Sequence, residues 1–105
     1  MEEARAFIAQ LDYKTTKKIF YNLDLAEQTN DSKLFKKLQH DIWEFRTKFA
    51  GLHIRLLAFW DKSDNKKVLV IATHGFIKKF SKVPAKEISK ALKLKDQYFE
   101  SKLKK

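Results

Sequence analysis

The stretch from Asp41 to Asp61, DIWEFRTKFAGLHIRLLAFWD, decides the fold, because its side chains alternate in character at every second residue. A period of two is typical of β-strands. In the first half, Glu44, Arg46 and Lys48 fall on one side and the aromatic residues fall on the other. Ala50-Gly51 is expected to form a turn, and a second alternating run follows it. The stretch therefore predicts a β-hairpin that carries cations on one side.

Outside this hairpin the sequence predicts one further strand and several helices. The alternating run from Lys67 to His74 is the expected third strand, and the polar segment 61–66 is the loop before it. Three strands with short connections favour an antiparallel meander, with one apolar face and one face that carries cations. Helical spacing appears in four groups: Ala4, Phe7, Ile8 and Leu11; Ile19, Phe20, Leu23 and Ala26; Leu34, Phe35 and Leu38; and Ile88, Ala91, Leu92, Tyr98 and Phe99.

These groups predict an N-terminal helical hairpin, one short further turn of helix, and a C-terminal helix. Asp12 is expected to cap the second helix, and Pro84 suits the first turn of the last one. The expected fold is α+β, a single domain over residues 1–105. Both helical regions are expected on one side of the sheet, either the side of Trp43 and Phe45 or the side of Leu56 and Trp60.

The composition limits the classes of function. The 105 residues carry a net charge of +10, and the basic excess lies in the second part: residues 1–61 hold 10 basic and 9 acidic side chains, and residues 62–105 hold 13 and 4. Such asymmetry favours a polyanionic or acidic partner over a merely soluble surface. There is no cysteine, no apolar run of membrane-spanning length and no signal peptide, so we expect a cytoplasmic protein.

Two arginines are the first candidate site residues. Arg46 and Arg55 flank the expected turn on neighbouring strands, so both could reach one phosphate. A planar guanidinium binds phosphate oxygens in pairs. The alternative is that Glu44 pairs with one of these arginines on a solvated face, which the spacing slightly favours.

The second candidate is the segment His74-Gly-Phe-Ile-Lys-Lys-Phe80, followed by Lys82. Lysines between aromatic rings suit single-stranded RNA, because a lysine holds phosphate and a ring stacks on a base. We expect Gly75 to let the backbone turn here. The alternative is that Phe76 and Phe80 are core residues, and we expect this of at least one of them.

Known catalytic motifs are absent from the sequence. The three histidines show no zinc-ligand spacing, so we expect no metal site. No P-loop, GxGxxG or GxSxG motif is present, so nucleotide hydrolysis and serine hydrolysis have no support. Cleavage of a phosphodiester without a metal remains. It needs cations for the charge on phosphorus and groups that move protons, for which His74, Glu44 or a lysine of lowered pKa are candidates.

The sequence resembles the RelE/ParE toxin superfamily, specifically its HigB-like phage-derived branch. The segments that carry the resemblance are IWEFR at 42–46, GLHIR at 51–55, VLVIATHGFIKK at 68–79 and VPAKEISKA at 83–91. Their order and spacing cover most of the chain. The first and third of these segments are fairly specific in combination and weak singly.

The resemblance implies a RelE-like fold: a helical hairpin on a small twisted antiparallel sheet, with a C-terminal helix. It implies a type II toxin, an endoribonuclease that cleaves mRNA on the ribosome without a cofactor and is held inactive by an antitoxin, usually a helix-turn-helix protein. The polar positions that match are Glu44, Arg46, Arg55, His74, Lys78 and Lys79. We expect Glu44, Arg46, Arg55 and His74 to be catalytic, and Lys48, Phe76, Lys78, Lys79 and Lys82 to bind RNA.

Two alternatives stay open: a non-catalytic ParE-like toxin that binds a topoisomerase, and a basic RNA-binding module. The cluster of lysine and arginine favours cleavage over the ParE-like alternative. The sequence also departs from its relatives, which normally begin with a β-strand, whereas Met1 leads directly into the first expected helix. The first strand is therefore missing, or the start was assigned late, or the exposed sheet edge pairs with another chain.

Overall fold

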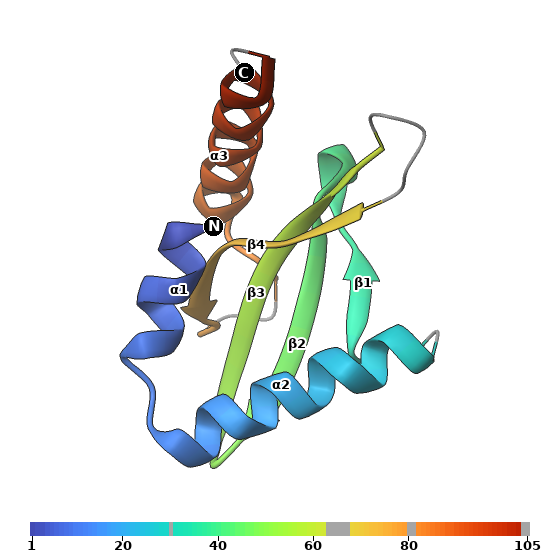
Figure 1. Ribbon diagram of the computed structural model, residues 1–105. Helices are drawn as coiled ribbons and strands as arrows, with labels where there is room; N and C mark the ends of the chain where they lie inside the picture. The colour runs from blue at the N-terminus through green and yellow to red at the C-terminus, as the bar shows by residue number, and fades with distance from the viewer. Residues whose placement is uncertain (30, 63–67, 80–81, 104–105) are drawn as a thin grey trace.

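The computed structural model describes residues 1–29, 31–62, 68–79 and 82–103. The elements in chain order are α1 (Glu2–Ala9), α2 (Tyr13–Gln28), β1 (Phe35–Lys37), the 3₁₀ turn η1 (Gln39–Asp41), β2 (Trp43–Phe49), β3 (Leu52–Asp61), β4 (Val68–Ile77) and α3 (Ala85–Leu103). The strands form an antiparallel sheet in the order β1-β2-β3-β4. Figure 1 shows α2 running across one end of the sheet and α3 rising at the other. Among the described residues, no helix has the length and apolar character needed to cross a bilayer.

The predicted β2–β3 hairpin and the meander are confirmed. Phe49 pairs with Leu52 across Ala50 and Gly51, whose φ angles of 52° and 80° are those of a tight two-residue hairpin turn. The third predicted strand is longer than expected, because β4 continues through Gly75, Phe76 and Ile77. The loop prediction for 61–66 lies largely outside the described residues.

The predicted helical turn at Leu34, Phe35 and Leu38 is wrong, because Phe35–Lys37 form the edge strand β1. The Phe35 ring stacks on Trp43 at 4.6 Å and on Phe45 at 4.4 Å, centroid to centroid. Such cross-strand aromatic pairs stabilise a sheet. The spacing of three apolar residues was helical, but the partner rings on β2 determine the structure.

The helices cover both faces of the sheet, so the expectation that all helices pack on one side is wrong. Phe45, Ile54 and Leu56 point to one face, where they pack with Ala4 of α1 and with Ile19 and Leu23 of α2. Ile42, Leu57 and Phe59 point to the other face, where they pack with α3. Trp43 and Phe45 turn out to lie on the same face as Leu56, since they alternate with the residues that face α3.

Of two expectations for the helical hairpin, one is confirmed and the other is wrong. The Asp12 carboxylate accepts a hydrogen bond from the Thr15 N–H at 2.7 Å, which confirms the predicted cap. Phe20, however, is 52% exposed and does not belong to the core. The buried face of α2 runs through Thr15, Ile19, Asn22 and Leu23, and Asn22 donates to the Thr47 hydroxyl of β2 at 3.3 Å.

Gly75 has a different role from the one expected. It lies within β4, and a Cβ atom built on it would lie 2.3 Å from the Phe7 ring of α1. The glycine therefore allows close packing between α1 and β4 and does not turn the chain.

The C-terminal helix is held at the far end of the sheet. Glu87 and Ile88 donate backbone hydrogen bonds to the Pro84 carbonyl, which places Pro84 at the start of α3 as predicted. Asp61, at the end of β3, accepts hydrogen bonds from Tyr98 at 2.6 Å and from Lys102 at 2.8 Å. These contacts tie α3 to the strand end, and the predicted apolar stripe of α3 packs on Leu57 and Phe59.

Candidate functional site

The polar residues predicted from the sequence lie in successive rows across the face of the sheet that α3 partly covers. Glu44 pairs with Leu57, and Leu57 with His74; in the next row Arg46 pairs with Arg55, and Arg55 with Phe76. Beyond them Lys48 pairs with His53, whose carbonyl accepts a hydrogen bond from the Lys78 N–H at 2.7 Å. Alternation along each strand puts all of these side chains on one face.

Glu44 lies between the two arginines. Its carboxylate is 3.5 Å from Arg46 Nε and 3.3 Å from Arg55 Nε. The expected pairing of Glu44 with arginine is thus observed, but the expected solvated setting is wrong, because Glu44 and Arg55 are each only 3% exposed. Arg46 keeps 31% of its side chain exposed, so of the two arginines it is the one that a ligand can reach.

The Glu44–Arg55 pair is poorly aligned. Glu44 Oε2 and Arg55 Nε are buried and make no hydrogen bond within the described part of the chain, although Arg55 Nη1 donates to the Ile54 carbonyl at 3.1 Å. Burial lowers the pKa of Arg55, and the charge of Glu44 opposes that shift. A buried acceptor and donor without partners cost stability unless another group completes them.

A cleft with a volume of 400 Å³ opens at Glu44 and Arg46, and we call it the charged cleft. Its walls come from β1 and η1, from β2, from the segment after β4 and from α3. Its lining residues are Lys36, Lys37, Leu38, Gln39, Glu44, Arg46, Lys78, Lys82, Val83 and Ile88. Five cations thus surround one carboxylate, an arrangement that favours an anionic ligand.

Lys78 turns toward this cleft, as expected for at least one lysine of the pair. Burial, followed by the charge of Arg55, lowers its pKa below the usual lysine value. Lys79 is the next residue, so the alternation puts it on the side opposite to Lys78. It is exposed and does not line the charged cleft. Lys82 is exposed and lines the cleft near the start of α3.

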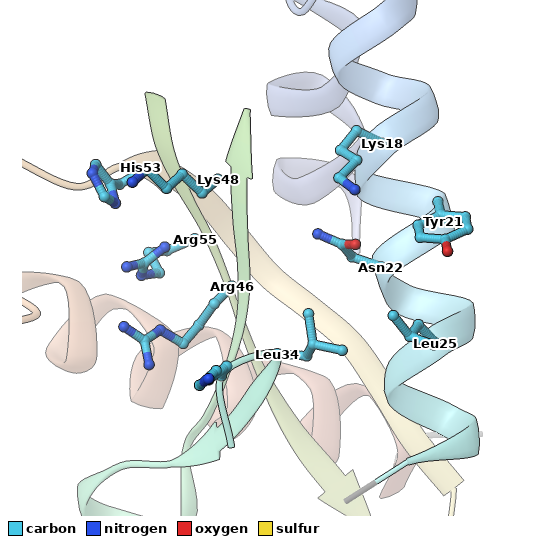
Figure 2. Close-up of a pocket in the computed structure, with 10 residues that line it drawn as sticks. Lys18, Tyr21, Asn22, Leu25, Leu34, Arg46, Lys48, His53 and Arg55 are labelled. Atoms are coloured by element: carbon cyan, nitrogen blue, oxygen red, sulfur yellow. The ribbon is translucent and has the colours of Figure 1, made fainter. Parts of the chain in front are cut away.

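A second hollow, of 580 Å³, adjoins the charged cleft and shares Arg46 with it. Figure 2 shows Arg46, Arg55, Lys48 and His53 reaching out on the same side of the strands, while Asn22 of α2 faces the strands from the other side. Lys48 and His53 are exposed at this place.

His74 is set apart from Glu44 by the full width of β3 and lies 2% exposed beneath the start of α3. Its Nε2 atom is 3.4 Å from the Glu87 carboxylate, and its Nδ1 atom is 3.0 Å from the Thr73 hydroxyl. Burial lowers its pKa, and Glu87 opposes the shift. Phe76 stacks on His74 at 6.0 Å and packs with the core cluster under α3. Phe80 lies outside the described residues.

The sequence reasoning missed the contribution of β1. Lys36 pairs with Glu44 across the sheet and lines the charged cleft with Lys37. Phe35, Lys36 and Lys37 do not alternate in character, so this short strand has no period-two signal in the sequence. Within the described ranges, no group of three or more histidine, cysteine, aspartate or glutamate side chains could hold a metal ion.

The fold and the cleft define an α+β protein with two N-terminal helices, an antiparallel sheet, a C-terminal helix and a cationic cleft around a buried carboxylate. Residues 6–96 match the family model for phage derived protein Gp49-like (DUF891), so the chain belongs to the Gp49-like family, a family of RelE-like toxins. Searches of curated proteins and of solved structures found no significant match. The matched range includes every lining residue of the charged cleft.

Proposed function

We propose that this protein is the toxin of a type II toxin–antitoxin system, an endoribonuclease of the HigB-like branch with a RelE-like fold. It cleaves mRNA, on the ribosome, with protein groups alone. The observation that carries the proposal is Glu44: a buried carboxylate whose Oε2 atom has no hydrogen-bond partner in the described chain, on the floor of a cleft lined by cations. The family, whose members are RelE-like toxins, supports the toxin class.

In the proposed reaction, Glu44 accepts the proton of an RNA 2′-hydroxyl. The 2′-oxygen then forms a bond to phosphorus, and the bond from phosphorus to the 5′-oxygen breaks. Lys78 donates a proton to this leaving oxygen, since its lowered pKa makes it a better acid than an ordinary lysine. The products are a 2′,3′-cyclic phosphate and a 5′-hydroxyl, so the protons and the electron pairs balance.

The arginines have separate tasks in this proposal. Arg46, which is partly exposed, binds the phosphate oxygens and stabilises the extra charge of the transition state. Arg55 is buried and holds Glu44 in place from below, so it is a positioning residue. His74 contacts Glu87 of α3 and we assign it to the support of that helix, whereas Lys82 and Lys36 attract the RNA backbone into the cleft.

The loss of stability caused by the cluster of Glu44, Arg46 and Arg55 supports a functional role for it. Arg46 and Arg55 are paired directly across two strands, and like charges in that position destabilise a sheet. Burying Glu44 and Arg55 costs further free energy that their mutual attraction does not reliably return. A fold under selection for stability alone would gain from apolar residues here.

The test is cleavage of an end-labelled mRNA by the purified protein, with translating ribosomes in a buffer that contains Mg²⁺ and without ribosomes in the presence of EDTA. The wild type should cut and leave a 2′,3′-cyclic phosphate. Arg46→Ala should cut about 10²- to 10³-fold more slowly, as is typical for the loss of one donor to a transition-state oxyanion. Lys93→Ala on the exposed surface of α3 is the matched control for loss of one positive charge.

Circular dichroism and thermal unfolding should show that both variants fold like the wild type. If the wild type cuts no RNA under either condition, or if Arg46→Ala cuts at the wild-type rate, the proposed function is wrong. Wild-type binding to a topoisomerase without RNA cleavage would favour the ParE-like alternative.

A further inference from the structure

A third hollow lies beside the charged cleft, at the end of the sheet opposite the β2–β3 turn. It has a volume of 460 Å³. Trp43 of β2, Trp60 of β3 and Phe99 of α3 supply aromatic walls, and both tryptophans are half-buried. We call it the tryptophan hollow. Lys37 lines both this hollow and the charged cleft, so the two are neighbours.

Cations surround the aromatic walls. Among the residues that the structure describes, Lys37, Lys62 and Lys95 line the hollow with one carboxylate, that of Asp41. Lys37 Nζ lies 3.2 Å from Asp41 Oδ1, and the pKa of Asp41 is lowered, chiefly by Lys37 and further by Lys95 and Lys62. Three positive charges thus face one negative charge.

The Lys37–Asp41 pair is weak, because the two side chains are 56% and 74% exposed. Exposed ion pairs contribute little stability, and a phosphate can replace the carboxylate as the partner of the lysine. Lys37 is therefore available to an anion that enters the hollow.

We propose that the tryptophan hollow binds a nucleotide that flanks the scissile phosphate, its base against Trp43 or Trp60 and its phosphate on Lys37, Lys62 or Lys95. This inference rests on the proposed function and extends it by a second RNA subsite. Single-stranded RNA is recognised by aromatic stacking combined with cations along the backbone. Charge and continuity through Lys37 favour RNA over a protein ligand.

The sequence provides a direct probe, because Trp43 and Trp60 are its two tryptophans and both line this hollow. A 2′-O-methyl RNA hexanucleotide, which cannot be cleaved through its 2′-oxygen, should change the tryptophan emission in a saturable manner. A dinucleotide, which fills only the charged cleft, should bind without this change.

Substitutions then locate the binding. Trp60→Ala should weaken hexanucleotide binding about five- to 150-fold and leave dinucleotide binding unchanged. Because Trp60 lies near the Phe35 ring and this variant could unfold, Lys62→Gln/Lys95→Gln provides a second test without loss of an aromatic side chain. It should lower the slope of log affinity against log salt by about 0.7 for each lysine that contacts a phosphate. Lys14→Gln/Lys93→Gln is the control with the same loss of charge outside the three hollows.

Asp41→Asn should tighten hexanucleotide binding, because it frees Lys37 while asparagine tolerates the φ of 61° at this position.

The inference is overturned by the following result. The hexanucleotide binds in an Arg46-dependent way, but it does not change the tryptophan emission, and its affinity for Lys62→Gln/Lys95→Gln is the same as for Lys14→Gln/Lys93→Gln. In that case the proposed function still stands. If the wild type neither binds nor cuts RNA, the proposed function fails, and the inference with it. Loss of an acidic protein partner by Lys62→Gln/Lys95→Gln, with unchanged RNA affinity, would assign the hollow to a protein and overturn the inference.

Discussion

The sheet face toward α3 is divided into two halves of opposite character. In one half Leu57 and Phe59 are fully buried against α3. In the other half Glu44 and Arg55 are almost as buried but charged, and the charged cleft opens at Glu44. The boundary runs between direct neighbours, because Leu57 pairs with Glu44 across the strands. Similar burial with opposite chemistry indicates that the apolar half supports folding, and we infer that the charged half is kept for binding and catalysis.

The largest effect should come from the buried ion pair. Arg55→Met leaves Glu44 buried with only the partly exposed Arg46, and Glu44→Leu leaves Arg55 unpaired, so each should lower the free energy of unfolding by about 3–5 kcal/mol. Glu44→Leu/Arg55→Met makes the charged half resemble the apolar half. The double variant should be as stable as the wild type or more so, and inactive. Urea denaturation of the four proteins measures this.

A double variant whose loss equals the sum of the two single losses would contradict the comparison, because the two residues would then act independently. Because loss of Arg55 should destabilise the protein, the test of activity uses Arg46, whose substitution should leave folding unchanged.

The next effect concerns the pH dependence of cleavage. Lys78 must be protonated to donate, so the rate should fall as pH rises through its lowered pKa, that is, below the ordinary lysine value of 10.5. Lys78→Ala should lose this alkaline fall and about 10²- to 10⁴-fold in rate. A pH–rate profile for RNA cleavage measures both. An unchanged alkaline fall in Lys78→Ala would assign the acid to another group, and Lys79→Ala is the control from the exposed side of the chain.

How far the sequence predicts this division can be judged from particular residues. The period of two placed Arg46 and Arg55 on one face, because alternation in a strand is a local property. The burial of Glu44 and Arg55 was not predictable in this way, since it depends on β1 and on the packing of α3. Charged residues are seldom buried, so the solvated ion pair was the natural expectation.

The misses share a cause, which is that distant partners overrule local spacing. Leu34, Phe35 and Leu38 have helical spacing, but the rings of Trp43 and Phe45 hold Phe35 in a strand. Lys36 was missed with that strand. The local sequence predicts a turn at Gly75, because the Phe7 ring that packs on this glycine is far away in the sequence.

A smaller effect should come from His74, at the edge of the apolar half. Its folded-state pKa lies below the ordinary value of 6.5. Below that pH the unfolded chain therefore binds a proton at this histidine that the folded chain does not bind. Stability should therefore fall between about pH 7 and about pH 5. His74→Gln should show a smaller fall, and His53→Gln, which changes an exposed histidine, should behave like the wild type. Urea midpoints at several pH values measure this, and equal slopes for His74→Gln and the wild type would mean that another group titrates.

The smallest effect should come from the turn that ends the charged half. Beyond the end of β1, this end of the hairpin is positioned by the pairing of β3 with β2 and with β4 and by the turn. A slip of one residue between β2 and β3 would move Arg46 and Arg55 to opposite faces. Ala50 adopts a φ of 52°, which is unfavourable for alanine, whereas asparagine before glycine is the preferred pair in such a turn. Ala50→Asn should raise the free energy of unfolding by about 0.5–1 kcal/mol and leave cleavage unchanged.

Ala50→Val introduces a β-branched residue, which tolerates a positive φ least. It should lower stability and also slow cleavage, because Arg46 would no longer be held opposite Arg55. Urea denaturation and the cleavage assay on both variants separate the two effects. If Ala50→Val loses stability but cuts RNA at the wild-type rate, the turn does not position Arg46, and the charged half keeps its geometry through the Glu44 pair alone.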